Sequence, residues 1–109
     1  MITINAKPMS VNDCWQGRRF KTQEYKRYEQ FCKLFLKKQS WLDFTRPLLV
    51  WFEFWFSNKA SDCDNPIKPH LDILSKIYWF NDNMIYKIVA NKKIVPKGQE
   101  YTKIFISNL

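Results

Sequence analysis

The sequence predicts an α/β (α+β) fold, in which one mixed β-sheet packs against two main helices in the order β-α-β-α-β-β. Three observations support this class. A chain of 109 residues has the length of a single domain, so residues 1–109 are expected to form one. One apolar stripe with helical spacing lies in the first half of the chain. Residues 48–56 are almost all aromatic or branched, as in a buried strand.

The chain begins with a predicted strand and a long basic loop. Residues 1–6 alternate between apolar and polar side chains, which predicts a short strand. Residues 7–21 contain several turn-forming residues together with Trp15, Arg18, Arg19 and Lys21. A loop of this length in a small domain is more often functional than idle, so we expect a basic arm that carries an aromatic side chain.

A helix of about 16 residues is expected after Thr22, which is a suitable N-cap. Its buried stripe recurs at helical spacing and consists of Tyr28, Phe31, Cys32, Phe35 and Leu36. The opposite face is rich in lysine and arginine. A solvated face and a DNA-facing one are both compatible with this pattern.

Residues 48–56 predict a central strand that is covered on both faces. A second helix follows, with Asp64 or Asn65 as its cap and Pro66 at its first position, where a missing N–H costs nothing. His70 is expected on the surface of this helix. Residues 84–90 and 101–107 predict the last two strands, which a lysine-bearing hairpin loop at residues 91–98 connects.

The charge of the chain favours a polyanionic partner. There are 18 lysines and arginines against 10 acidic residues, a net charge of +8. Nucleic acid is the first candidate, although a basic surface that only maintains solubility remains an open alternative. The three cysteines form no zinc-binding pattern with the single histidine, which favours reduced thiols. Neither a signal peptide nor a membrane-spanning run is visible, so we expect a cytoplasmic location and no membrane partner.

The acidic segment after the central strand carries the strongest functional pattern. Asp62 and Asp64 are two residues apart, so their carboxylates face the same way in an extended chain. Lys68 and Asp72 follow at helical spacing, and Asp82 lies in the turn after the helix. Carboxylates without histidine or cysteine suit Mg²⁺ or Mn²⁺, and such a site can hydrolyse phosphodiesters. The structural alternative is a helix cap followed by a surface ion pair.

This spacing resembles the RusA-like family of Holliday junction resolvases, many of which are encoded by phages and prophages. Members carry a D-x-D-N-x-x-K-x-x-x-D stretch, which here runs from Asp62 to Asp72. An aspartate pair follows the helix in the family, and here it is Asn81-Asp82, so the first aspartate is replaced. Residues 17–22 and 96–98 agree with the family as well, and the resemblance covers nearly the whole chain.

The resemblance implies a RusA-like fold and a homodimer. It further implies a Mg²⁺-dependent crossover junction endodeoxyribonuclease, acting in DNA recombination and repair. Such an enzyme cuts four-way junction DNA by paired, symmetric nicks. Asp62, Asp64 and Asp82 would bind the metal, Lys68 would be the catalytic lysine, and Asp72 would have a secondary role. The implied location is the bacterial cytoplasm, or that of the host if a phage encodes the protein.

Contacts with the DNA backbone are predicted for basic and aromatic residues elsewhere in the chain. They are Trp15, Arg18, Arg19, Lys21, Lys59, Lys92 and Lys93. Two other hypotheses stay open: a nuclease for flaps, forks or other branched DNA, and a non-catalytic DNA-binding module. The intact aspartates argue against the second, because a pure binder would gain affinity by losing negative charge at its DNA surface.

Overall fold

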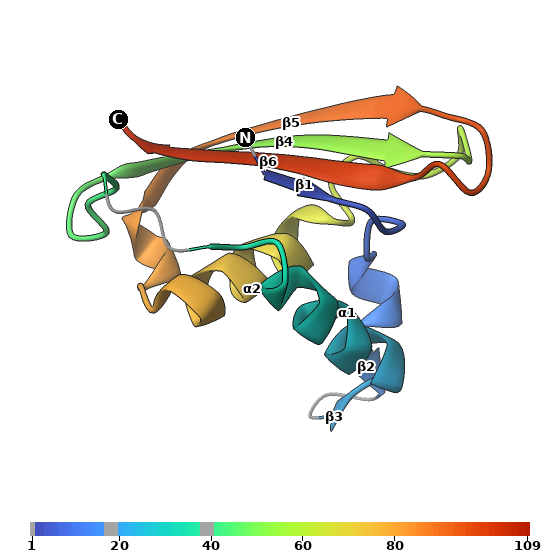
Figure 1. Cartoon of the computed structure of the whole chain (residues 1–109), viewed down its shortest axis with the longest axis horizontal. Coiled ribbons are helices and arrows are strands. Elements are labelled where there is room, and N and C mark those ends of the chain that lie inside the picture. Colours follow the sequence, from blue (N-terminus) through green and yellow to red (C-terminus); the bar gives the residue numbers. More distant parts are fainter. Residues whose placement is uncertain (1, 17–19, 38–40) are drawn as a thin grey trace.

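A four-stranded mixed sheet forms one layer of the protein, and two helices form the other (Figure 1). The computed structural model describes residues 2–16, 20–37 and 41–109. The strands lie in the order β1 (Ile2–Ile4), β6 (Tyr101–Asn108), β4 (Leu48–Phe56) and β5 (Ile85–Ile94). β4 and β5 are parallel, whereas β6 is antiparallel to β1 and to β4. The predicted mixed sheet is therefore confirmed.

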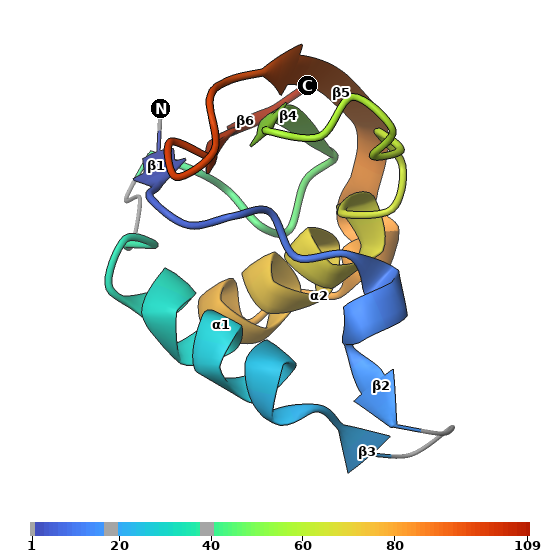
Figure 2. The same ribbon diagram turned by 90° about the vertical axis from the view of Figure 1, so that its right-hand side faces the viewer.

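Both helices lie on the same side of the sheet (Figures 1 and 2). They are α1 (Gln23–Lys33) and α2 (Ile67–Tyr78), and α2 is the crossover that the parallel strands β4 and β5 require. Three short elements precede α1: η1 (Val11–Asp13), β2 (Trp15–Gln16) and β3 (Phe20–Lys21). A further turn, η2 (Asp82–Met84), leads into β5. The predicted order is confirmed for the main elements, and the β2–β3 hairpin is added where only a loop was expected.

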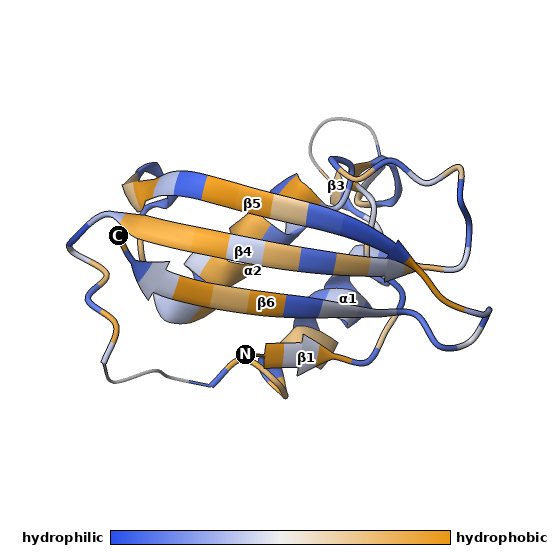
Figure 3. Cartoon of the chain, turned by 90° about the horizontal axis from the view of Figure 1, so that it is seen from above, coloured by the Kyte–Doolittle hydropathy of each residue, from blue (hydrophilic) through white to orange (hydrophobic). Residues whose placement is uncertain are grey.

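β4 forms the centre of the core on one of its faces. Leu48, Val50, Phe52, Phe54 and Phe56 are buried, and the residues between them are half-buried. Successive strand residues point to opposite faces, so this alternation shows that the described helices cover only one side. Figure 3 looks onto the other side, which none of the described helices covers. The prediction of a strand covered on both faces is wrong.

α1 begins where the sequence predicts but ends earlier. The Thr22 hydroxyl accepts a 3.2 Å hydrogen bond from the backbone N–H of Tyr25, so Thr22 is the N-cap. The helix has 11 residues. Beyond it the chain tightens, because the N–H groups of Leu34 and Phe35 bond to carbonyls three residues back. Leu36 is nevertheless buried, so the end of the predicted apolar stripe reaches the core from outside the helix.

The boundaries of α2 and β5 also differ from the predictions. Pro66 precedes the first helical residue, and no side chain caps α2. The backbone carbonyl of Asp64 accepts the N–H of Ile67 at 3.1 Å instead. β5 continues to Ile94 rather than ending at Ala90, because it pairs with β4 as far as Phe56. Residues 91–94 therefore belong to a strand and not to the hairpin loop.

Candidate active site

Asp62 and Asp64 lie between β4 and α2, and both side chains are exposed. The Asn65 amide is 3.5 Å from an Asp62 carboxylate oxygen, to which it donates a long hydrogen bond. The preceding loop is attached to β5, because the Lys92 ammonium donates a hydrogen bond to the backbone carbonyl of Lys59. The two carboxylates therefore project into solvent from a segment that β5 and the first turn of α2 hold on either side.

Lys68, in the first turn of α2, contacts two aspartates from different parts of the chain. Its Nζ lies 2.7 Å from Oδ1 of Asp72, one helical turn later, and 3.7 Å from Oδ2 of Asp82 in η2. The hydrogen bond to Asp72 has the largest effect and raises the pKa of Lys68; burial opposes it, and the charges of Asp72 and Asp82 add to the increase, so the net pKa is raised. The ammonium is thus fully charged at neutral pH.

Asn81 positions Asp82 by capping η2. Its side-chain oxygen accepts the backbone N–H of Asn83 at 3.0 Å, and its carbonyl accepts the N–H of Met84 at 3.0 Å. Asparagine and aspartate are equally good at this kind of cap. The replacement at residue 81 therefore keeps the turn that presents Asp82 and removes one negative charge beside it.

The three aspartates predicted to bind a metal are not gathered into one cluster. Among residues 2–16, 20–37 and 41–109, no group of three or more His, Cys, Asp or Glu side chains is placed to hold a metal ion. The chemistry of the donors nevertheless fits a hard cation such as Mg²⁺, since Asp62, Asp64 and Asp82 offer only carboxylate oxygens. All three are exposed. Metal binding by these residues stays a prediction.

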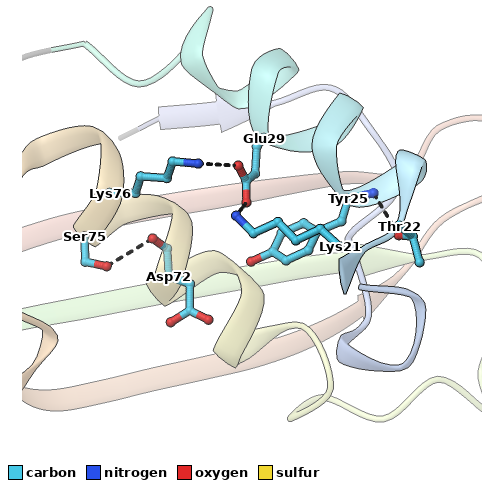
Figure 4. Close-up of polar contacts among 7 residues, drawn as sticks. All are labelled: Lys21, Thr22, Tyr25, Glu29, Asp72, Ser75 and Lys76. Atoms are coloured by element: carbon cyan, nitrogen blue, oxygen red, sulfur yellow. Dashed lines mark hydrogen bonds and ion pairs between the residues drawn. The ribbon is translucent and has the colours of Figure 1, made fainter. Parts of the chain in front are cut away.

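A buried carboxylate that the sequence analysis missed links the two helices (Figure 4). Glu29 of α1 accepts hydrogen bonds from Nζ of Lys21 at 2.5 Å and from Nζ of Lys76, on α2, at 2.9 Å. Burial raises the pKa of Glu29, but the hydrogen bonds and charges of the two lysines outweigh it, and the net pKa is lowered. A signal was present in the sequence, because residue 29 is four positions after Tyr25, on the apolar face of α1.

Asp72 contacts Lys68 within α2 and also influences Tyr25 of α1 through its charge. Burial and then the negative charge of Asp72 raise the pKa of the Tyr25 hydroxyl. Figure 4 shows the Tyr25 ring beside the Glu29 bridge and the Asp72 carboxylate pointing away from that bridge. Asp72, predicted to have a secondary role, holds the ammonium of Lys68 by a 2.7 Å hydrogen bond.

The described residues predicted to contact DNA have different surroundings in the structure. Lys92 and Lys93 are neighbours on β5 and point to opposite sides of the sheet. Lys92 reaches the loop carbonyl of Lys59, whereas Nζ of Lys93 lies 5.6 Å from the centre of the Trp55 ring on the outer face. The two lysines therefore lie on opposite faces of the edge strand β5, and their contact with DNA stays a prediction.

The N-terminal arm is only partly described. Trp15 is 42% exposed and packs edge-on against Tyr25, with 6.0 Å between ring centres. Lys21 is engaged by Glu29, which it shares with Lys76, so its charge is only partly compensated within the protein. Arg18 and Arg19 lie outside the described residues, and their predicted role stays a prediction.

His70 is buried, and the prediction that it lies on the surface is wrong. It is 1% exposed, and the rings of Phe52 and Phe54 pack against it. A carbonyl can only accept, so His70 Nδ1–H donates to the backbone carbonyl of Pro66 at 2.7 Å. Nε2 then accepts the Tyr28 hydroxyl proton at 2.6 Å. His70 falls three positions after Ile67, at the spacing of the buried stripe of α2, and this spacing was the missed signal.

The fold and the site define a class: a basic α+β domain with an acidic, lysine-containing site at the end of a central strand. Residues 5–107 match the model of the family described as endodeoxyribonuclease RusA, and the chain belongs to this family. It is accordingly a structure-specific endonuclease of the Holliday junction resolvase kind, which acts on branched DNA. A comparison with curated proteins finds no match. None of the described helices combines the length and apolar character that crossing a membrane would require.

Proposed function

We propose that this protein cuts four-way junction DNA by Mg²⁺-dependent hydrolysis, with paired nicks placed symmetrically about the junction. The observation that carries this proposal is the contact of one lysine, Lys68, with Asp72 and with the distant Asp82. It gathers a cation and two carboxylates close to the exposed Asp62 and Asp64 segment, in the family whose members cut DNA.

Asp62, Asp64 and Asp82 would hold the metal. When bound, Mg²⁺ would lower the pKa of a coordinated water and neutralise charge on the phosphate. The two contacts of Lys68 differ in strength, because only the 2.7 Å contact with Asp72 is within hydrogen-bonding distance. Asp82 can therefore release Lys68 and bind the metal at a lower free-energy cost than Asp72 could. Asp72 would meanwhile keep the ammonium of Lys68 oriented toward the phosphate.

Paired cuts need two active sites, and we propose a homodimer whose two-fold axis matches the junction. The outer face of the sheet is the surface that best suits a second copy. It carries Trp51, Trp55, Tyr101 and Phe105, and the Trp55 and Tyr101 rings stack with 4.9 Å between centres. Phe105→Glu should yield monomers in sedimentation velocity, whereas Leu34→Glu, at an apolar and even more exposed position on the helical layer, should not. Dimers that persist in Phe105→Glu would place the contact elsewhere.

A cleavage assay on a mobile four-way junction tests the proposed reaction. With Mg²⁺ the wild type should produce symmetric nicks that product mapping locates, and with EDTA it should produce none. Asp64→Asn and Lys68→Ala should lose at least about 100-fold in cleavage rate and keep junction binding. The controls Glu24→Gln and Lys97→Ala make the same changes in charge at exposed positions and should cleave normally.

Two outcomes would replace this proposal. Faster cutting of flaps or forks than of four-way junctions at matched concentration would assign a different branched substrate. Binding of branched DNA without cleavage in any divalent metal would indicate a non-catalytic module. The proposed place of action is the cytoplasm of a bacterium, or of an infected host, because the substrate is DNA.

A further inference from the structure

Trp79 combines two unusual properties at the end of α2. It is 91% exposed, the highest value among the large apolar residues of the described chain. It also adopts left-handed backbone angles, φ 57° and ψ 62°, as the only described residue other than glycine with a positive φ. Glycine or asparagine normally occupies such a position, because a bulky side chain is strained there. A tryptophan here stabilises neither the helix end nor the core.

The backbone on both sides of Trp79 is fixed. The N–H groups of Trp79 and Phe80 both donate to the carbonyl of Ser75. The Tyr78 and Phe80 rings both stack on Phe44, with 5.5 and 5.1 Å between ring centres. The two flanking aromatics are thus held against one ring, while the indole between them is turned to solvent. The backbone that carries this indole is therefore held in place.

The surroundings of Trp79 suit one base of a nucleic acid. An open groove of about 770 Å³ runs beside it, lined by the aliphatic part of Ile77, by Asn81 and by the lysines Lys33 and Lys76. Lys33 forms no ion pair with any residue of the described ranges, and Lys76 remains half-exposed although it contacts Glu29. An aromatic platform next to ammonium groups is the arrangement with which proteins hold an unpaired base and its phosphate.

The position of Trp79 in the chain limits how far it can lie from Asp82 in the candidate active site. Three residues of extended chain span at most about 11 Å, so the Cα atoms of Trp79 and Asp82 are no farther apart than that. This length corresponds to about three nucleotide steps along a strand. Since the two side chains extend beyond their Cα atoms, a base that stacks on Trp79 lies within several nucleotides of a phosphate at Asp82.

We propose that Trp79 is a base-stacking residue, whose indole packs on a base that the branch point leaves unstacked, with the adjacent phosphate near Lys33 and Lys76. The inference rests on the proposed action on branched DNA and adds a specific contact. Branched DNA offers exposed base faces at the branch, whereas the interior of a linear duplex has none. Trp79 therefore contributes selectivity for branched over linear DNA, and Asp82 and Lys68 act on the nearby phosphate.

Equilibrium binding measured in EDTA separates this contact from cleavage. Trp79→Ala should raise the dissociation constant for a four-way junction roughly 5- to 150-fold, and Trp79→Phe should restore most of the affinity. The Kd for a linear duplex of the same arm sequence should not change. The matched control is Trp41→Ala, since Trp41 is also exposed, at 75%, and lies away from the groove.

Trp79→Asn separates binding from stability. Asparagine tolerates the left-handed backbone, so this variant should melt no lower than the wild type while it loses junction affinity as Trp79→Ala does. In addition, 2-aminopurine placed within three nucleotides of the branch should change its fluorescence on binding wild type but not Trp79→Ala.

The outcomes are distinguishable. If the wild type binds junction and duplex equally, the proposed function fails. If the wild type prefers the junction and Trp79→Ala stays within twofold of it, the stacking role is wrong. A shift of Trp79→Ala to a smaller oligomer in sedimentation would also overturn it, because the indole would then be a subunit contact.

Discussion

The buried imidazole of His70 should make the stability of the protein depend on pH in a range where few other groups titrate. Its burial lowers the pKa to about 4, and the hydrogen bond to the Pro66 carbonyl opposes this only in part. In the unfolded chain the pKa returns to its ordinary value near 6.5. Between these values the unfolded chain binds a proton that the folded protein does not.

The sign and the size of the effect follow from the two pKa values. Stability is complete above pH 6.5 and falls as the pH decreases toward 4, because protonation favours the unfolded chain. From pH 7 to pH 5 the free energy of unfolding should decrease by about 2 kcal/mol. Since His70 is the only histidine and carboxylates titrate mostly below pH 5, this loss belongs to one residue.

Urea denaturation at pH 7, 6 and 5, followed by circular dichroism, measures the loss. His70→Gln should remove most of the dependence in this window, whatever its stability at pH 7. An NMR titration of the single imidazole in the wild type measures the folded pKa directly and does not depend on the variant folding. A folded pKa above 6, or a loss below about 0.5 kcal/mol between pH 7 and 5, would refute the assignment.

Three further predictions concern stability and can share the same urea assay. Glu29→Gln should lower the free energy of unfolding by about 1–2 kcal/mol at pH 7, because it weakens two charged hydrogen bonds. The control Glu24→Gln, on the exposed face of the helix, should leave stability unchanged. An equal effect of both variants would contradict the buried bridge. The depressed pKa of Glu29 means that this contribution is present above the ordinary carboxyl pKa and disappears as the pH falls. Phe54→Ala should cost about 3–5 kcal/mol, since Phe54 is fully buried, and a smaller cost would indicate a core that collapses into the space. Thr22→Ala should cost about 1 kcal/mol through loss of the N-cap, and Thr22→Ser should restore it.

Strong local signals made the main elements predictable from the sequence. The apolar run at residues 48–56 is long enough to define β4, and Thr22 defines the start of α1. The acidic segment could be recognised because its pattern depends only on the sequence spacing of a few charged residues. Its contact between Lys68 and Asp72 follows directly from the helical repeat.

Other features depend on partners that are distant in the chain. The length of β5 is set by pairing with β4, so the polar sequence of residues 91–93 does not indicate it. Glu29 and His70 are buried because lysines and a tyrosine from other elements satisfy them. The sequence did not indicate that one face of the sheet is uncovered, because that face carries tryptophans. Half-buried aromatic residues and a strand covered on both faces give the same apolar sequence pattern.

The order of strands in the sheet constrains how the chain can fold. β6 is the last strand along the chain, yet it lies between β1 and β4, and Ile2 pairs opposite Ile104. Until residues 101–108 are available, β1 has no partner and β4 exposes one edge of an aromatic strand. Contacts this far apart in sequence form late and slowly, which leaves β4 open to aggregation during synthesis. A chain truncated before residue 101 should therefore accumulate as insoluble material, whereas the full chain can close its sheet only after synthesis has passed this strand.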